Sequence, residues 1–169
     1  DDDDDDDDEE EQEVEKEITK KIKVGLLTNE IPPIVYGGVA TWIVNFIQMF
    51  EGHPTIEIIP IFLAYNDPLP NECLIKYPNI RVIEKEDDIR ICFEDIDTVI
   101  HLAADRSAEA PWNSVLKNNL IGTYNVFEAA SWTNIQRLVY ASSIAENGDK
   151  ETFGDRQINE PKLSETVNV

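Results

Sequence analysis

The sequence has little of what disulfide-bonded, zinc-stabilised or membrane-spanning proteins need. It has two cysteines, Cys73 and Cys92, and neither has a second Cys or a His at metal-ligand spacing, which excludes a disulfide framework and a zinc ribbon. No apolar run approaches the ~18 residues that span a bilayer, and no basic segment followed by an apolar one opens the chain. We therefore expect a cytoplasmic protein with no metal site and no membrane contact. The first residue is Asp1 rather than Met, which is compatible with a fragment.

Basic residues are also scarce. Lys and Arg total 14 against 35 Asp and Glu, so the net charge is −21. Residues 1–17 hold fourteen of these acids and one lysine. A like-charge run without apolar anchors repels itself and stays solvated, which predicts a disordered acidic tail over residues 1–21, with cation binding or docking on a basic partner as alternatives. Binding of nucleic acid is disfavoured because its phosphates would be repelled.

The remaining chain alternates short apolar runs with helical periodicity. Val39 to Phe50 and Leu116 to Ala130 have helical spacing, and in the second segment one face is formed by Leu116, Leu120, Thr123, Phe127 and Ala130. We expect small Gly122, Ala129 and Ala130 to let this helix lie close on the sheet. Strands are predicted at Lys23–Thr28, Ile56–Ala64, Ile80–Ile83, Asp97–Leu102 and Arg137–Ala141. This pattern predicts a three-layer Rossmann-like α/β fold over residues 22–150, with an open, mainly parallel twisted sheet of about five strands. Residues 151–169 are expected to be irregular, and ligands to lie beyond the carboxyl ends of the strands.

Five segments in the second half carry a resemblance. They are Asp88-Ile89-Arg90, Asp97-Thr-Val-Ile-His101-Leu-Ala-Ala104, Asn119-Leu-Ile-Gly122-Thr123-Tyr-Asn125-Val, Glu128-Ala-Ala130 and Val139-Tyr-Ala-Ser142-Ser143. In this order and spacing, residues 79–149 resemble the extended short-chain dehydrogenase/reductases, which include NAD-dependent sugar-nucleotide epimerases and dehydratases. The resemblance implies NAD as cofactor and a nucleotide-sugar as substrate.

The resemblance also implies a role for each matched residue. Asp88 would hydrogen-bond the adenine, and Asn119 would tie the long helix to the backbone of a neighbouring strand. Ser143 would be the catalytic residue that positions the reacting hydroxyl. The other cofactor-binding residues would be His101, Leu102, Ala103, Ala104 and Ser142. Two alternatives stay open: His101 as an ordinary core histidine, and the two serines as turn residues.

Two features of that family are missing. The family has a Gly-x-x-Gly-x-x-Gly loop directly after its first strand, whereas Gly25 here lies inside the strand and Gly37 and Gly38 come some nine residues after it. No tyrosine follows Tyr140, so the family's Tyr-x-x-x-Lys pair is absent from this sequence. We therefore expect the isolated chain to be incomplete and inactive.

The opening of the chain resembles a different family. Lys23-Val-Gly-Leu-Leu-Thr-Asn-Glu30-Ile-Pro-Pro33 and Tyr36-Gly-Gly-Val-Ala-Thr-Trp42 are similar to the first segment of glycogen/starch-synthase-type retaining glycosyltransferases, over residues 22–66. The resemblance implies that Gly37 and Gly38 form a phosphate or sugar loop at a helix N-terminus, with a missing partner domain. The alternative is a glycine turn that merely enters a helix.

Because the similarity changes between residues 66 and 79, we expect a natural or engineered chimera of two Rossmann halves. Three functions follow. The first is an NAD-dependent epimerase/dehydratase-like domain that binds a dinucleotide or nucleotide-sugar. The second is a glycosyltransferase lobe that binds a sugar nucleotide without NAD, and the third is a non-catalytic Rossmann-like domain. The oligomeric state stays open.

Overall fold

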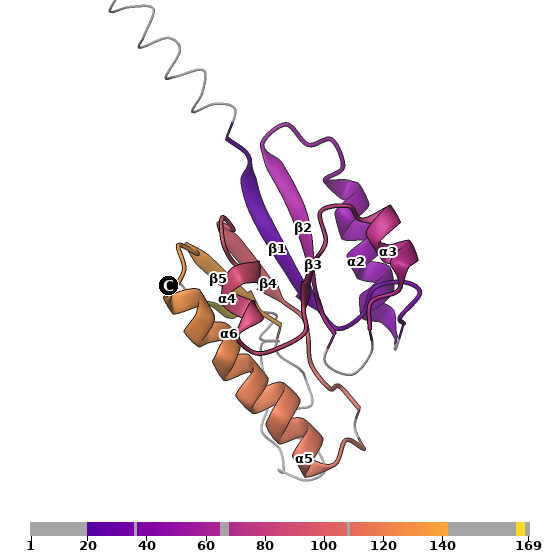
Figure 1. Ribbon diagram of the computed structural model, residues 1–169, viewed down its shortest axis with the longest axis vertical. Helices are drawn as coiled ribbons and strands as arrows, with labels where there is room; N and C mark the ends of the chain where they lie inside the picture. Colours follow the sequence, from indigo (N-terminus) through magenta and orange to yellow (C-terminus); the bar gives the residue numbers. More distant parts are fainter. Residues whose placement is uncertain (1–19, 36, 65–67, 108, 142–164, 168–169) are drawn as a thin grey trace, which may run out of the picture.

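The computed structural model describes residues 20–35, 37–64, 68–107 and 109–141, and the backbone of residues 165–167. They form a six-stranded sheet with helices on both faces (Figure 1). The strands are β1 (Ile22–Thr28), β2 (Ile56–Leu63), β3 (Arg81–Ile83), β4 (Thr98–His101), β5 (Arg137–Tyr140) and β6 (Glu165–Val167). The helical segments are α2 (Gly38–Met49), α3 (Asn71–Lys76), α4 (Asp88–Cys92), α5 (Trp112–Ser114), the π-helix η1 (Val115–Ile121) and α6 (Gly122–Ser131).

The strand order is β3-β2-β1-β4-β5-β6, the doubly wound Rossmann order. The first five strands pair in parallel, and β6 pairs with β5 in the antiparallel direction. The predicted Rossmann-like fold is confirmed, and each predicted strand lies within two residues of its position. Two short helices, α3 and α4, were not predicted, and β6 lies in the segment that was expected to be irregular. Neither α3 nor α4 completes two helical turns, so neither shows a helical period.

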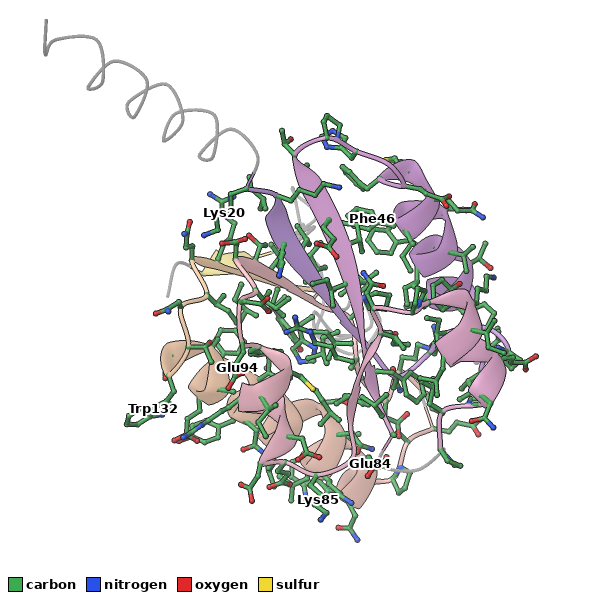
Figure 2. All side chains as sticks on the ribbon, turned by 45° about the horizontal axis from the view of Figure 1, so that its top comes forward. Lys20, Phe46, Glu84, Lys85, Glu94 and Trp132 are labelled. Atoms are coloured by element: carbon green, nitrogen blue, oxygen red, sulfur yellow. The ribbon has the colours of Figure 1, made fainter. Side chains whose placement is uncertain are left out.

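Alternation along β4 divides the core into two layers. Val99 and His101 face α6, while Ile100 and Leu102 face α2. On the α2 side, Ile43 packs against Leu26 of β1, and Phe46 of α2 points toward the sheet (Figure 2). The α6 side holds the larger buried cluster, which includes the α4 residues. Burial on both faces explains why the strands are apolar runs rather than alternating ones.

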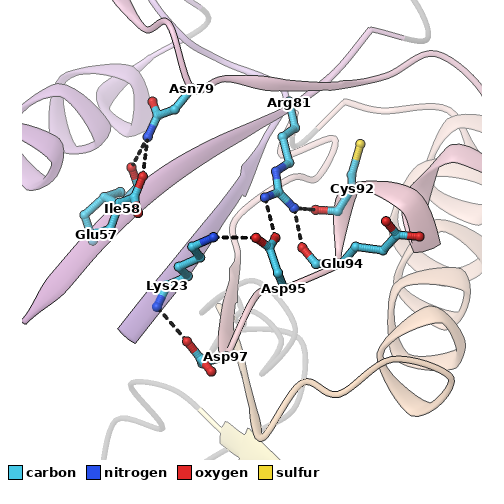
Figure 3. A network of polar contacts seen from close by, with 9 residues as sticks. All are labelled: Lys23, Glu57, Ile58, Asn79, Arg81, Cys92, Glu94, Asp95 and Asp97. Atoms are coloured by element: carbon cyan, nitrogen blue, oxygen red, sulfur yellow. Dashed lines mark hydrogen bonds and ion pairs between the residues drawn. The ribbon is translucent and has the colours of Figure 1, made fainter. Parts of the chain in front are cut away.

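Pro60 lies inside β2, where a missing backbone N–H would normally weaken the sheet. Pro60 pairs with Leu26 of β1 on one side. On the other side, β3 pairs only with residues 61–63 of β2, so Pro60 lies just outside that ladder. The side chain of Asn79 reaches this uncovered edge and donates to the carbonyl oxygen of Ile58 at 3.0 Å (Figure 3). The short length of β3 therefore makes Pro60 compatible with a strand interior.

The predicted long helix is continuous over residues 112–131, but its middle is π-helical. Its hydrogen bonds there span five residues instead of four, which changes the angular position of the side chains. Leu120 was expected on the buried face and is 53% exposed, which corrects that expectation. Beyond the π-helix, Ala129 and Ala130 are buried against the sheet as predicted from their small size.

A polar network ties the chain together near the amino-terminal ends of β1 and β4 (Figure 3). The N–H of Lys23 donates to Asp97 at 2.7 Å, and the Lys23 ammonium forms an ion pair with Asp95. Arg81 donates to the same Asp95 carboxylate and to the carbonyl oxygens of Cys92 and Glu94. These two cations hold the pKa of Asp95 below its usual range. The network joins β1, β3 and the loop before β4.

We expect Gly25→Ala to destabilise the fold by about 1–3 kcal/mol, because an added methyl group overpacks the core. A Cβ at Gly25 would lie 2.8 Å from Cδ1 of Ile61 and 3.2 Å from Cγ2 of Ile96. Gly38→Ala is the matched control, since a Cβ there meets nothing within 4 Å. Urea unfolding of both variants measures the difference. If the two variants are equally stable, packing does not require a glycine at position 25.

Candidate functional site

A cavity of about 690 Å³ opens at the carboxyl ends of β1, β2 and β4. This is the lower edge of the sheet in Figure 1. Asn29 and Glu30 follow β1, Leu63 ends β2, and Ala103 and Ala104 follow β4. The cavity also receives residues of η1 and α6, among them Lys117, Asn118, Gly122 and Asn125. The strand order reverses between β1 and β4, so the cavity lies where open α/β sheets bind ligands.

Asn119 fixes the loop that forms one wall of the cavity. Its side-chain amide accepts from the N–H of Asp105 at 2.7 Å and donates to the Asp105 carbonyl oxygen at 2.7 Å. The Asp105 carboxylate accepts hydrogen bonds from the Ser114 hydroxyl and the Ser107 N–H. Asn119 therefore ties the helix to the backbone beyond β4. Its position agrees with the structural role predicted for it, and it does not line the cavity.

His101 ends β4 and is 1% exposed. Its Nε2 lies 3.4 Å from the Thr123 hydroxyl oxygen, and its ring lies beside that of Tyr140. Its Nδ1 has no hydrogen-bond partner among the described residues. Burial lowers the pKa of His101 from its usual 6.5 to about 4, so the imidazole is neutral at pH 7. His101 lines the cavity and is also buried, and its contact with a cofactor stays a prediction.

A buried acid, which the sequence did not single out as a site residue, stands beside the amino terminus of α2. Glu30 is 2% exposed, and its Oε2 accepts from the N–H of Gly37 at 3.1 Å. Its carboxylate also forms an ion pair with Arg106, which belongs to the loop after β4. Asn29 makes a second link, donating to the Ala104 carbonyl oxygen at 3.3 Å. The sequence offered one signal for this contact, which is an acidic residue two positions after the predicted first strand.

Each of the remaining predicted site residues lines the cavity, lies away from it, or falls outside the described residues. Ala103, Ala104 and Gly37 line the cavity. Leu102 packs toward α2 on the other face of the sheet and does not line the cavity, and its contact with a cofactor stays a prediction. Asp88 accepts from the N–H groups of Glu84 and Lys85, so it holds the turn before α4, and its contact with adenine stays a prediction. Gly38 opens α2 without lining the cavity. Ser142 and Ser143 lie outside the described residues.

The sequence of the second half of the chain matches a known family. A model described as "NAD dependent epimerase/dehydratase family" matches residues 79–168. The chain belongs to this family. The match begins just before β3 and covers the strands and helices that form the Asp105–Asn119 wall of the cavity.

Two curated relatives are from Haloferax volcanii. An "L-arabinose 1-dehydrogenase (NAD(P)(+))" is 48% identical over 61 residues, which is 36% of this chain and 24% of the relative. An "NAD-dependent glucose-6-phosphate dehydrogenase" is 40% identical over 70 residues, which is 41% of this chain and 27% of the relative. These alignments span about a quarter of each curated relative.

Solved structures show the same fold. The alignment with the UDP-N-acetylglucosamine 4-epimerase from Methanobrevibacter ruminantium M1 covers 88% of this chain and 45% of the epimerase chain, with a TM-score of 0.57 and 19% identity. The alignment with the UDP-glucuronic acid 4-epimerase from Bacillus cereus, solved with NAD, covers 76% of this chain and 42% of the epimerase chain, with a TM-score of 0.53 and 18% identity. At these identities the likeness concerns the fold.

The glycosyltransferase-like opening and the chimera gain no support. Residues before and after position 70 share one sheet, because β1 pairs with both β2 and β4. A single epimerase structure covers 88% of the chain, which includes residues on both sides of that position. One Rossmann fold accounts for the arrangement, and the matches to known proteins lend no support to a glycosyltransferase segment or to a chimera.

Two further observations on the described residues concern membrane-spanning helices and metal-ion sites. No helix among them is long and apolar enough to cross a membrane. In the same residues, no group of three His, Cys, Asp or Glu side chains could hold a metal ion.

We expect Asn119→Asp to destabilise the chain by about 2 kcal/mol, because it replaces the amide donor with an acceptor that faces the Asp105 carbonyl oxygen. Asn113→Asp is the control, since Asn113 is exposed in α5, and should change stability by less than about 0.5 kcal/mol. Urea unfolding at pH 7 measures both. A difference within error would mean that the Asn119 contacts do not hold the loop.

We expect stability to fall by about 3 kcal/mol between pH 6.5 and pH 4 through His101 alone. The unfolded chain takes up the proton near pH 6.5 and the folded chain only near pH 4, so this stability is present above pH 6.5 and lost as the pH falls. His101→Asn should remove this part of the slope. His53→Asn removes the other histidine and should leave the His101 contribution in place. Denaturant unfolding across pH 4–7 tests the difference in slope between the two variants.

Proposed function

We propose that this chain is the nucleotide-binding part of an NAD-dependent sugar-nucleotide epimerase or dehydratase, and that its cavity receives the cofactor. Family membership and the position of the cavity at the β1/β4 switch point are the observations that carry the proposal. NAD, when bound, supplies a reversible hydride acceptor. The chain's own residues would bind and orient it.

The residues present fit an adenosine and a nicotinamide better than they fit a pyrophosphate. Ala103 and Ala104 leave room for close approach of a ligand to the backbone beyond β4. His101 presents a buried nitrogen without a partner among the described residues. By contrast, the Glu30 carboxylate stands beside the amino terminus of α2, where Rossmann folds place pyrophosphate. Cofactor binding is therefore proposed without the usual glycine-rich phosphate loop.

Hydride transfer by this chain alone is not proposed. The predicted catalytic Ser143 needs a general base or acid beside it, which the family supplies with a Tyr-x-x-x-Lys pair. No tyrosine follows Tyr140 in this sequence. The chain also spans less than half of the epimerase structures that it matches. The proposed activity belongs to a protein in which further residues complete the site.

Parallel calorimetric titrations with NAD and UDP-glucose test the proposal. Binding of NAD supports it, and binding of neither ligand would favour a non-catalytic domain. Binding of UDP-glucose alone would favour the glycosyltransferase-like interpretation of residues 22–66, in which Gly37 and Gly38 contact a phosphate or sugar.

We expect Ala104→Leu to weaken NAD binding by about tenfold or more, because the larger side chain fills space that the cofactor needs. Ala110→Leu is the control, since Ala110 lies in the same loop region but does not line the cavity. Titration calorimetry measures both affinities, and a thermal melt confirms that both variants are folded. If Ala104→Leu binds NAD as tightly as the unmodified chain does, this cavity is not the cofactor site.

A further inference from the structure

The amino terminus of α2 already has an anion beside it. The twelve-residue helix begins at Gly38, and the N–H of the preceding residue, Gly37, donates to Glu30 at 3.1 Å. Exposed N–H groups and the helix dipole favour negative charge at this position. In a Rossmann fold this is the place of the ligand's pyrophosphate. Here a carboxylate from the chain itself lies there.

The position of Glu30 is fixed by its surroundings. The hydroxyl of Thr28 accepts from the Glu30 N–H at 3.0 Å and donates to the Glu30 carbonyl oxygen at 2.9 Å. These two bonds hold the backbone of Glu30 immediately beyond β1. The side chain is 2% exposed, so its carboxylate is a built part of the cavity wall rather than a mobile surface group.

Arg106 completes this arrangement from the other half of the chain. Its guanidinium forms an ion pair with Glu30 and lies so close to Gly37 that a Cβ there would be 2.9 Å from Nη2. Gly37 has an extended backbone, with φ of 171°, so a glycine is favoured there by this close approach rather than by its backbone conformation. Arg106 is therefore a cation beside the amino terminus of α2, and Glu30 engages it.

We propose that Glu30 is a specificity-determining residue that excludes pyrophosphate from the amino terminus of α2. The inference rests on the proposed function of the cavity as a nucleotide site. A phosphate that approached α2 would find the Gly37 N–H and the Arg106 guanidinium already engaged by the Glu30 carboxylate, and it would have to displace that carboxylate or lie beside a like charge. The chain therefore gains little affinity from the phosphates of a nucleotide, and binds it through its nucleoside parts.

The unmodified chain gives the first test. Calorimetric titrations with adenosine, ADP-ribose and NAD should show that ADP-ribose binds within about twofold of adenosine. A gain of about tenfold or more from adenosine to ADP-ribose would overturn the inference, because the pyrophosphate would then be recognised. This comparison needs no variant and does not depend on how a substitution affects folding.

Glu30→Gln gives the second test. Glutamine keeps the size of the side chain and an oxygen that accepts from Gly37, and it removes the charge. ADP-ribose and NAD should bind about tenfold more tightly to this variant, while adenosine affinity stays within about twofold. Glu86→Gln is the matched control, because Glu86 is exposed, lines the same cavity and carries the same charge. Glu86→Gln should not raise the affinity for ADP-ribose and NAD while leaving the affinity for adenosine unchanged.

The outcomes separate the inference from the proposed function. If both chains bind all three ligands with equal affinities, the cavity is a nucleotide site and the inference about Glu30 is wrong. If neither chain binds any of them, the proposed function is wrong and the inference falls with it. A similar gain in Glu30→Gln and Glu86→Gln would indicate a general charge effect and would also overturn the inference.

Discussion

The pairing of β1 with β4 is the contact on which the rest of the molecule depends. Four residues of β1, Val24 to Leu27, align in parallel with four residues of β4 that follow more than seventy positions later. This pairing places the loop after β1 beside the loop after β4 and so creates the cavity between them. The hydrogen bond from Asn29 to Ala104 and the ion pair of Glu30 with Arg106 both cross this junction. The two halves of the sequence meet in one site because two strands share one ladder.

Much of the fold could be predicted because its strands are buried on both faces. The run over residues 58–63 is apolar throughout, and the alternation of such runs with helical segments indicates a parallel sheet. Short elements escaped prediction because α4 has five residues, fewer than two helical turns, and β6 reads Glu-Thr-Val, without the apolar run that marked the other strands. The π-helix escaped because a change from four-residue to five-residue hydrogen bonds leaves no mark in composition.

The site was predicted less completely than the fold. Ala103, Ala104, His101 and Gly37 line the cavity, and these positions could be inferred because they follow strands or precede a helix. The partnership of Glu30 with Arg106 could not, since the two residues are far apart in sequence and their contact depends on strand order. The similarity of residues 22–66 to a second family predicted a chimera, and the matches to known proteins lend no support to it. A glycine-containing loop before a helix is a local pattern that unrelated Rossmann folds can share.

The π-helical turns of η1 have a consequence for how this wall of the cavity could change over evolution. A π-helical stretch accommodates an additional residue within a helix. Loss of one residue from Val115–Ile121 would therefore restore ordinary α-helical geometry, while the turns on either side kept nearly the same faces toward the sheet. Lys117 and Asn118 lie inside the π-helical stretch, so the change would fall on side chains that line the cavity, while Val126 and Ala130 would keep their places against the sheet. A single-codon deletion could thus change the residues that face a ligand without dismantling the core.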